Sequence, residues 1–308
     1  MTTAKTTAKT TAKAAGTTAT ATAAGTTTGT PASARPRAGN VYLGGLLAPR
    51  GLTGLALIGV IGLLGLLAPV LADAAPTAQS GQALLDPGSG GHLLGTDEVG
   101  RDLLSRVLHG IRTDLAIILV AVPTAAVAGS LLALLATASR PADVVVQRVF
   151  DLLLAFPGLI LALAITAIMG PGYLPVIVVI ALAEIPGFGR VLRGGILVQR
   201  EREYAVAARV GGASRLRVLT RHVLPNAVDP LVVQLAVSLP IAVFIEGAMS
   251  FLGVGVRPPE PTLGSVLSQA MPYLSSHPSF AAAPLIAVTG LVLGFTLIAE
   301  ALNKGVRR

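Results

Sequence analysis

The polar residues of this sequence are unevenly spread, and the densest group is the segment 201–226. It reads EREYAVAARVGGASRLRVLTRHVLPN and carries seven charged side chains and one histidine in 26 residues. Across the whole chain only 12% of the residues are charged. Such side chains can hold a loop in water, anchor a membrane protein or border a contact with a partner. The elements around them decide among these roles.

Two more carboxylates, Glu184 and Glu246, lie within long apolar stretches. An ionisable group inside a membrane span is costly and often functional. Glu184 either lines a translocation path or is satisfied by a neighbouring helix, and both interpretations stay open. Pro186-Gly187 beside it loosens the helix.

A third polar group occurs in GTDEVGRDLLSRVLHG, within residues 92–110. Its charged members are Asp97, Glu98, Arg101, Asp102 and Arg106, and its apolar members are Val99, Leu103, Leu104 and Val107. The pattern predicts an amphipathic helix lying in the membrane interface. A metal site formed by His92, Asp97 and Asp102 is conceivable, but no ligand spacing recurs, so we expect no metal.

The residues that several kinds of chemistry require are absent from this sequence. The chain has no cysteine, and its four histidines show no zinc-binding spacing. Lysine occurs only at Lys5, Lys9, Lys13 and Lys304, none in the Gly-Lys-Ser/Thr setting of a phosphate-binding loop. No hydrolase motif surrounds a Ser, His and Asp. We therefore expect neither a catalytic residue nor a directly bound cofactor. If ATP and Mg²⁺ are used, we expect another polypeptide to bind them.

The hydropathy of the chain indicates an all-α integral membrane protein. Its mean hydropathy is +0.75 and 53% of its residues are hydrophobic. A helix needs roughly 20 apolar residues to cross the hydrocarbon core. Six spans are predicted, at residues 52–71, 115–138, 151–169, 173–192, 230–252 and 280–301. Gly170-Pro171-Gly172 marks a tight turn between the third and the fourth span.

The basic residues predict the topology of these spans. With six spans, 19 of the 23 Lys and Arg residues fall on one side of the membrane. Because cytoplasmic loops are enriched in Lys and Arg, both termini and the loop 200–226 are expected in the cytoplasm. The segment 92–110 is then extracytoplasmic. The net charge of +8 reflects this topology, and no nucleic-acid partner is expected.

The N-terminal residues 1–45 form a separate region. The tetrapeptide TTAK occurs three times, and residues 1–39 contain no Leu, Ile, Val or Phe. A segment without such residues cannot bury a core, so a disordered cytoplasmic tail is predicted. A weak attraction of its three lysines to anionic lipid is the alternative.

The loop 200–226 has a helical pattern of its own. Tyr204, Ala207, Ala208 and Val210 recur at helical spacing, and Gly211-Gly212 breaks the helix. Ser214 is placed to cap a second short helix, with Leu216, Leu219 and Val223 on one face and Pro225 at its end. Composition alone also fits a loop that only anchors the topology.

At these residues the sequence resembles the permeases of ABC importers. Ala207-Ala208, then Gly212, then Leu224-Pro225 is similar to their EAA loop. The string EYAVAARVGGASRLRVLTRHVLPN resembles the C-type membrane subunit of the dipeptide/oligopeptide/nickel branch. LGTDEVGRDLLSR after His92 and EGAMSFLGVGV followed by Pro258-Pro259 resemble two further segments of that branch. The resemblance covers residues 92–308.

This resemblance implies a type I ABC importer permease fold and a function. The loop would be the coupling helix that docks on a cytoplasmic ATPase, through Glu203, Tyr204, Ala207, Ala208, Arg209, Gly211, Gly212, Ala213, Ser214, Arg217, His222, Leu224 and Pro225. The extracytoplasmic motif would be Gly95, Thr96, Asp97, Gly100, Arg101 and Asp102, and Glu246 would lie near the outer gate. The partners would be a second homologous permease, ATPase subunits, a substrate-binding protein and lipid of a prokaryotic cell membrane. The cargo would be dipeptides or short peptides.

The sequence departs from the pattern of the family in two places. Val206 stands where the EAA loop has its acidic residue, and Glu203 lies one turn earlier. Near the end of the chain the family has Gly-Asp followed by Leu-Arg, and this chain has Ala299-Glu300 and Leu302-Asn303. The individual contacts with a partner at these places are therefore open.

Three other functions remain to be tested. The same machinery could import nickel, oligopeptides or haem-like cargo. A self-sufficient proton-coupled carrier would use Glu184, although the two halves of the chain show no internal repeat. A membrane scaffold without transport would use the loop 200–226 only for binding.

Overall fold

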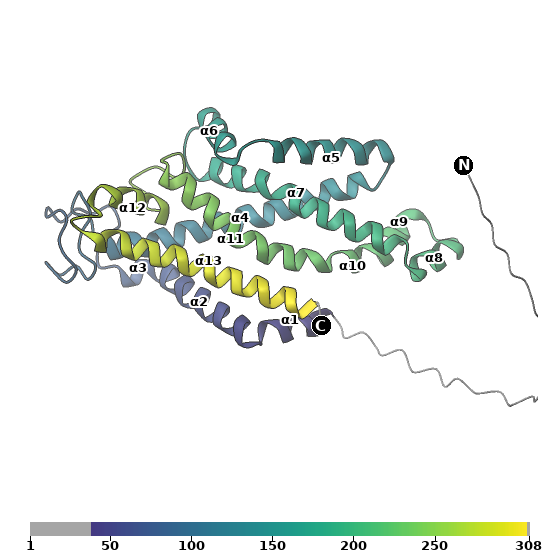
Figure 1. The fold of residues 1–308 in the computed structure, drawn as a ribbon, viewed down its shortest axis with the longest axis horizontal. Coiled ribbons are helices and arrows are strands. Elements are labelled where there is room, and N and C mark those ends of the chain that lie inside the picture. The colour runs from purple at the N-terminus through teal and green to yellow at the C-terminus, as the bar shows by residue number, and fades with distance from the viewer. Residues whose placement is uncertain (1–37, 307–308) are drawn as a thin grey trace, which may run out of the picture. The chain divides into compact units, whose positions relative to one another are not determined.

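The computed structural model describes residues 38–306, and their side chains from residue 42 to 305 (Figure 1). This part is built of helices joined by short turns and by two longer segments, residues 72–102 and 252–262. The helices are α1 (Ala38–Leu46), α2 (Pro49–Leu66), α3 (Ala68–Leu71), α4 (Leu103–Ala136), α5 (Arg140–Ala155), α6 (Gly158–Met169), α7 (Tyr173–Arg200), α8 (Glu203–Val210), α9 (Arg215–Val218), the π-helix η1 (Leu219–Val223), α10 (Leu224–Ala227), α11 (Asp229–Phe251), α12 (Leu263–Ala270), the 3₁₀ turn η2 (Met271–Tyr273) and α13 (Pro278–Val306).

Five of these helices are long and apolar enough to cross a membrane. They are α2, α4, α7, α11 and α13, and the bent pair of α5 and α6 makes a sixth if it is counted as one span. The chain is thus an all-α integral membrane protein. Large apolar side chains cover the outside of the helices: Ile168 is 85% exposed and Phe244 is 71% exposed. Such side chains are suited to lipid rather than to water.

The predicted third span, 151–169, is wrong as a single straight helix. The chain bends by 94° between α5 and α6. Pro157 has no amide hydrogen to donate, and it holds Phe156 in an extended conformation with φ −76° and ψ 128°. The first half of this span therefore begins earlier, at Arg140, and α5 lies along α7 (Figure 1).

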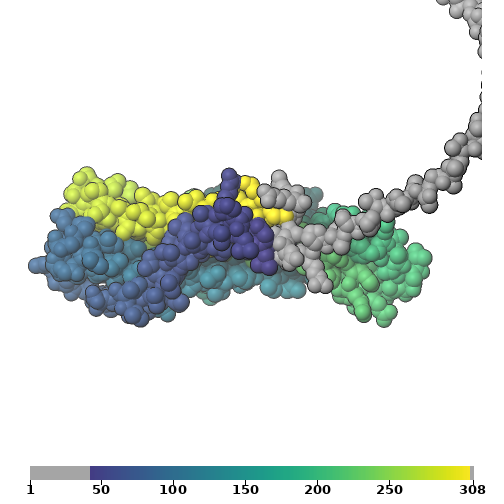
Figure 2. Space-filling view, turned by 90° about the horizontal axis from the view of Figure 1, so that it is seen from below, coloured from purple at the N-terminus to yellow at the C-terminus, as the bar shows by residue number. Residues whose placement is uncertain are grey.

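Close packing of helices depends on small residues, as is common in membrane proteins. A side chain added at Gly129 of α4 would stand 2.6 Å from the carbonyl oxygen of Ile185 in α7. One added at Gly54 of α2 would stand 2.9 Å from the carbonyl oxygen of Gly294 in α13. These glycines let α4 approach α7, and α2 approach α13. The second pair lies side by side in Figure 2, in purple and yellow.

The bundle of residues 38–306 carries different structures at its two ends (Figures 1 and 2). At one end the short helices α8 and α9 protrude beyond the long helices. At the other end the segment 72–102 packs with α12. The polar loop 200–226 and the polar segment 92–102 are therefore at opposite ends of the bundle.

The predicted tail extends too far, because α1 occupies residues 38–46. The Tyr42 hydroxyl donates a hydrogen bond of 2.8 Å to the carbonyl oxygen of Asp229 at the start of α11. Tyr42 and Leu46 also pack against Leu302 of α13. Through these contacts the last residues of the predicted tail pack against the helix bundle. The rest of that prediction, residues 1–37, lies outside the described residues.

Candidate functional site

The protruding loop 200–226 is almost entirely helical. The chain turns after α8 at Gly212, whose φ of +82° is a conformation that glycine adopts without strain. Ser214 then caps α9 by accepting a hydrogen bond of 3.4 Å from the Arg217 amide, as its position predicted. Gly211 has an ordinary helical φ of −71°, so the turn depends on the second glycine rather than on both.

The predicted end of the second helix at Pro225 is wrong. Pro225 lies in the first turn of α10, and α11 begins two residues after this helix ends. The first turn of a helix tolerates proline, because the amide there has no acceptor within the helix. The π-helix η1 joins α9 to α10, so the helical path continues from the loop into α11.

Four small or branched side chains attach the loop to the bundle. Ala205, Val218 and Val223 of the loop, and Ala227 directly after it, are buried against Ala133 of α4 and Leu192 and Ile196 of α7. Along the predicted face, Val223 is buried and Leu219 is half-buried, whereas Leu216 is 70% exposed.

The loop also carries apolar side chains that nothing in the described chain covers. Val210 is 85% exposed, Leu216 is 70% exposed, and Tyr204 and Val206 are about 40% exposed. Polar residues surround them, among which Glu203 and Arg217 are exposed. A protruding polar loop with uncovered apolar side chains has the properties of a docking surface.

Several other predicted loop residues have roles within the loop. The Tyr204 hydroxyl donates 2.6 Å to Gln199 Oε1, and Arg209 donates 2.9 Å to the carbonyl oxygen of Arg200. The carbonyl oxygen of His222 accepts 2.8 Å from Asn226. The predicted loop residues Ala207, Ala208, Ala213 and Leu224 lie at or near the surface around these bonds.

Glu184 of α7 is buried, 6% exposed, and its carboxylate accepts a hydrogen bond from the Ser238 hydroxyl of α11. The two interpretations of this residue were a pathway group and a carboxyl satisfied by a neighbouring helix. The structure provides the neighbouring partner. Gln234 of α11 in turn donates 3.3 Å to Ser238 Oγ, which extends the polar chain along α11.

Glu246 of α11 is 1% exposed and faces a residue that the sequence reasoning missed, Asp114 of α4. Glu246 Oε1 accepts 2.7 Å from the Ser250 hydroxyl, and Asp114 Oδ2 accepts 3.2 Å from the Leu263 amide of α12. The other oxygen of each carboxyl, Asp114 Oδ1 and Glu246 Oε2, is buried without a partner. Asp114 is the only acidic residue between Asp102 and Ala138, and this isolation in an apolar stretch could have identified it from the sequence.

The predicted amphipathic helix at 92–110 is wrong over its first part. Residues 92–102 form turns, and the helix begins at Leu103, where it is already the start of α4. Asp102 caps it by accepting 2.7 Å from the Ser105 amide, and it also accepts 2.8 Å from His92 Nδ1. Positive φ values at Gly95 and Gly100 allow these turns. Val99 and Leu103 consequently do not share a face: Val99 is 41% exposed and Leu103 is 1% exposed.

The charged residues of this segment form a buried cluster. Asp97 is 0% exposed, and its Oδ2 accepts hydrogen bonds of 2.6 Å from Arg101 Nε and 2.8 Å from Arg106 Nη1. Gln269 of α12 accepts 2.9 Å from Arg106. Thr96 joins the cluster to the preceding turn by donating 2.8 Å to the carbonyl oxygen of Gln82. Among residues 38–306 no three His, Asp or Glu side chains could together hold a metal ion.

Comparison with known proteins shows the family of this chain. Residues 115–308 match the family model described as binding-protein-dependent transport system inner membrane component. The chain belongs to this family. It is a permease subunit of an ABC importer and is not itself an enzyme.

The permease is similar to several curated bacterial proteins. It is 39% identical over 259 residues to the di/tripeptide transport system permease protein DppC of Pseudomonas aeruginosa, covering 82% of this chain and 86% of the relative. It is 39% identical over 250 residues to a putative peptide transport system permease of Brucella suis, covering 81% and 84%. It is 38% identical over 216 residues to the glutathione transport system permease protein GsiD of Pectobacterium atrosepticum, covering 70% and 72%.

Proposed function

We propose that this permease forms half of the translocation pathway of an importer for dipeptides and other short peptides. The peptide transport named for the relatives in Pseudomonas and Brucella supports this cargo. Glutathione is itself a small peptide, so the relative in Pectobacterium fits the same class. Nickel, oligopeptides and haem-like compounds remain the alternative cargoes. A substrate-binding protein outside the membrane does most of the selecting.

The loop 200–226 couples this permease to separate ATPase subunits. One observation carries this proposal: Val206, Val210 and Leu216 are exposed on a loop that protrudes from the bundle and is itself fixed to α4 and α7 by buried residues. Apolar side chains on a short helix can fill a groove of a partner, with polar residues at the rim. A second homologous permease completes the pathway, and ATP and Mg²⁺ bind to the ATPases.

This coupling requires both termini and the loop to be cytoplasmic, as the distribution of Lys and Arg predicts. Closure of the ATPases on ATP would then move α8 to α10. Because α10 is followed directly by α11, the motion reaches the helix that holds Ser238 and Glu246. Glu184 and Glu246 are the candidates for groups at the pathway or its gate. The extracytoplasmic segment 92–102 would stabilise the opposite end of α4.

Two exposed residues test the coupling role. Val210→Asp and Leu216→Asp should leave the folding of the permease intact, since substitutions at exposed sites change stability by only about 0.5 kcal/mol. A charge placed in an apolar groove should weaken ATPase binding by about tenfold or more, equivalent to about 1.4 kcal/mol. The ATPase that co-purifies with the solubilised complex and the ATP-dependent uptake of a labelled dipeptide should both fall.

Thr220→Asp is the matched control, because Thr220 is exposed on the same loop but is polar. It should keep both ATPase and uptake. Full uptake by the Val210 and Leu216 variants would disprove the coupling assignment. Proton-driven uptake by the permease alone in liposomes would instead favour the carrier, and a complex without any ATP-dependent flux would favour the scaffold.

A further inference from the structure

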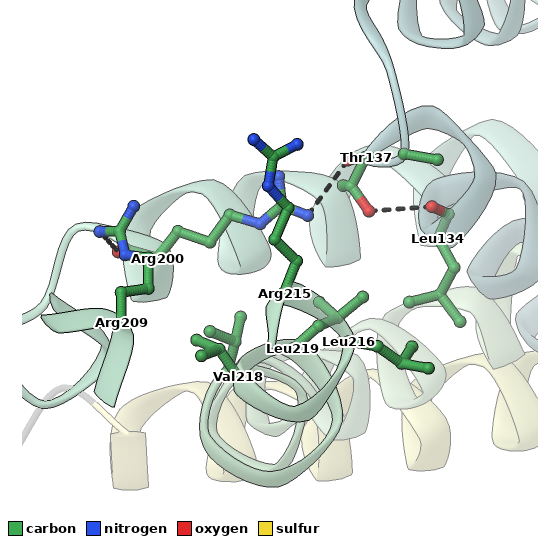
Figure 3. A pocket seen from close by; sticks show the side chains of 10 residues that line it. Leu134, Thr137, Arg200, Arg209, Arg215, Leu216, Val218 and Leu219 are labelled. Carbon is green, nitrogen blue, oxygen red and sulfur yellow. Dashed lines mark hydrogen bonds between the residues drawn. The ribbon is translucent and has the colours of Figure 1, made fainter. Parts of the chain in front are cut away.

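A pocket of about 480 Å³ lies between the protruding loop and the bundle (Figure 3). Its lining combines the end of α4, the end of α7 and the short helices of the loop. Three arginines from three separate helices reach it: Arg200 ends α7, Arg209 belongs to α8 and Arg215 begins α9. Leu134, Thr137, Ala138, Leu216, Val218, Leu219 and Val223 complete the lining. No acidic residue is among the lining residues.

The three guanidinium groups have little of their hydrogen-bonding capacity used. Arg200 donates 3.1 Å to the carbonyl oxygen of Thr137, and Arg209 donates 2.9 Å to the carbonyl oxygen of Arg200. An arginine has five N–H donors, so most of them stay available. Within residues 38–306 none of the three is paired with a carboxylate. The N-terminal residues 1–37 contain no Asp or Glu that could add one.

Three positive charges at one pocket repel one another, and an anion removes this repulsion. The planar fork of arginine matches the oxygens of a phosphate group and binds them in pairs. We propose that this pocket binds a phosphate group, with Arg200, Arg209 and Arg215 as its ligands. The charged side chains and the apolar wall of Leu134 and Leu219 together fit the phosphate and the glycerol–acyl junction of an anionic phospholipid.

The position of the pocket agrees with such a ligand. Leu134 and Thr137 mark the end of the long apolar run of α4, where a spanning helix reaches the lipid headgroups. Anionic lipid attracts basic side chains at this level of the membrane. A phosphate held there would join α7, α8 and α9, so that it would fix the loop against the ends of the long helices. A soluble phosphate compound could supply the same group.

The test uses the complete detergent-solubilised complex, stripped of lipid and titrated with phosphatidylglycerol. Native mass spectrometry counts the bound lipid for the unchanged complex, for the double variant Arg209→Gln/Arg215→Gln, and for Arg221→Gln. Arg221 is exposed on η1 and does not line the pocket, so it controls for the loss of a positive charge from the loop. Loss of two charge-assisted contacts should weaken the tightest phosphatidylglycerol binding by about 100-fold, or about 2.8 kcal/mol.

The control variant should bind as the unchanged complex does. Competition with glycerol 3-phosphate and inorganic phosphate distinguishes the sources: no displacement at millimolar concentration assigns the pocket to lipid, and displacement assigns it to a soluble phosphate. Equal phosphatidylglycerol binding and equal phosphate binding in the double variant and the control would overturn the proposal. Loss of the ATPase subunit with unchanged lipid binding would also overturn it, because the arginines would then bind protein.

Discussion

Asp114 of α4 and Glu246 of α11 place their carboxyl groups against each other in the interior of the bundle. Each of them also has a fixed partner, the Leu263 amide for Asp114 and the Ser250 hydroxyl for Glu246. The pair therefore connects α4, α11 and the start of α12 at one point. Two carboxylates so close repel each other strongly in a medium of low dielectric constant.

This arrangement predicts different effects for two substitutions of Glu246. Glu246→Gln keeps an N–H donor that can bond to Asp114, so the complex should stay folded and lose about 1 kcal/mol or less. Glu246→Ala leaves Asp114 and Ser250 without their partner and opens a cavity, so it should cost about 3 kcal/mol. Thermal unfolding of the purified complex measures the difference. Equal melting temperatures for the two variants would show that the carboxyls do not depend on each other.

The buried cluster at the opposite end of α4 gives a second prediction. Asp97→Asn leaves Arg106, which is 0% exposed, without its carboxylate, so it should destabilise the permease by about 3 kcal/mol. Glu98→Gln is the matched control, because within residues 42–305 the Glu98 side chain forms an ion pair only with Arg101, at 3.3 Å, and is itself 22% exposed, so the change should cost less than about 1 kcal/mol. Resistance to proteolysis and thermal unfolding of the complex report both. Comparable losses would contradict the special role of Asp97.

The turn between α8 and α9 gives a third prediction from neighbouring glycines. Gly212→Ala forces a side chain into a left-handed conformation and should destabilise the loop by about 1–2 kcal/mol. Gly211→Ala has an ordinary φ and should be nearly neutral. Protease sensitivity of the loop and binding of the ATPase measure the two effects. If Gly211→Ala destabilised the loop more than Gly212→Ala did, the positive φ of Gly212 would not be what makes a glycine necessary there.

Two glycines in the segment 72–102 have the same backbone conformation, but only one of them is closely surrounded by other atoms. Gly95 and Gly88 both have a positive φ, +83° and +82°. A side chain at Gly95 would stand 2.0 Å from the carbonyl oxygen of Leu85, whereas a side chain at Gly88 would meet nothing within 4 Å. Gly95→Ala should therefore cost about 2 kcal/mol or more beyond the 1–2 kcal/mol expected for Gly88→Ala. Equal unfolding temperatures would show that the segment simply relaxes.

The sequence was informative where the signal is local. Apolar runs predicted the long helices, and the position of Ser214 predicted the cap of α9. It was misleading at prolines, because a proline can stand in the first turn of a helix or break one. Pro225 was expected to end a helix, but it stands in the first turn of the next one. Pro157 was passed over inside an apolar run, although it breaks the helix and bends the span.

The charged segment 92–102 shows a different reason for a wrong prediction. Alternating charged and apolar residues resemble an amphipathic helix, yet the charges there bond to one another and to Gln269 of α12. A pattern of residues does not reveal a partner that lies far along the chain. Asp114 was missed for the same reason, because its importance comes from Glu246.

By itself the sequence determined that this chain is a helical membrane protein with one long polar loop, and its motifs determined the family. Hydropathy and motif spacing are properties of neighbouring residues, so they can be found without the fold. Only the tertiary structure decided that Asp114 meets Glu246, that Ser238 satisfies Glu184, and that three arginines of separate helices share one pocket. These contacts join helices far apart in the chain, and they depend on how closely small residues such as Gly129 allow those helices to pack.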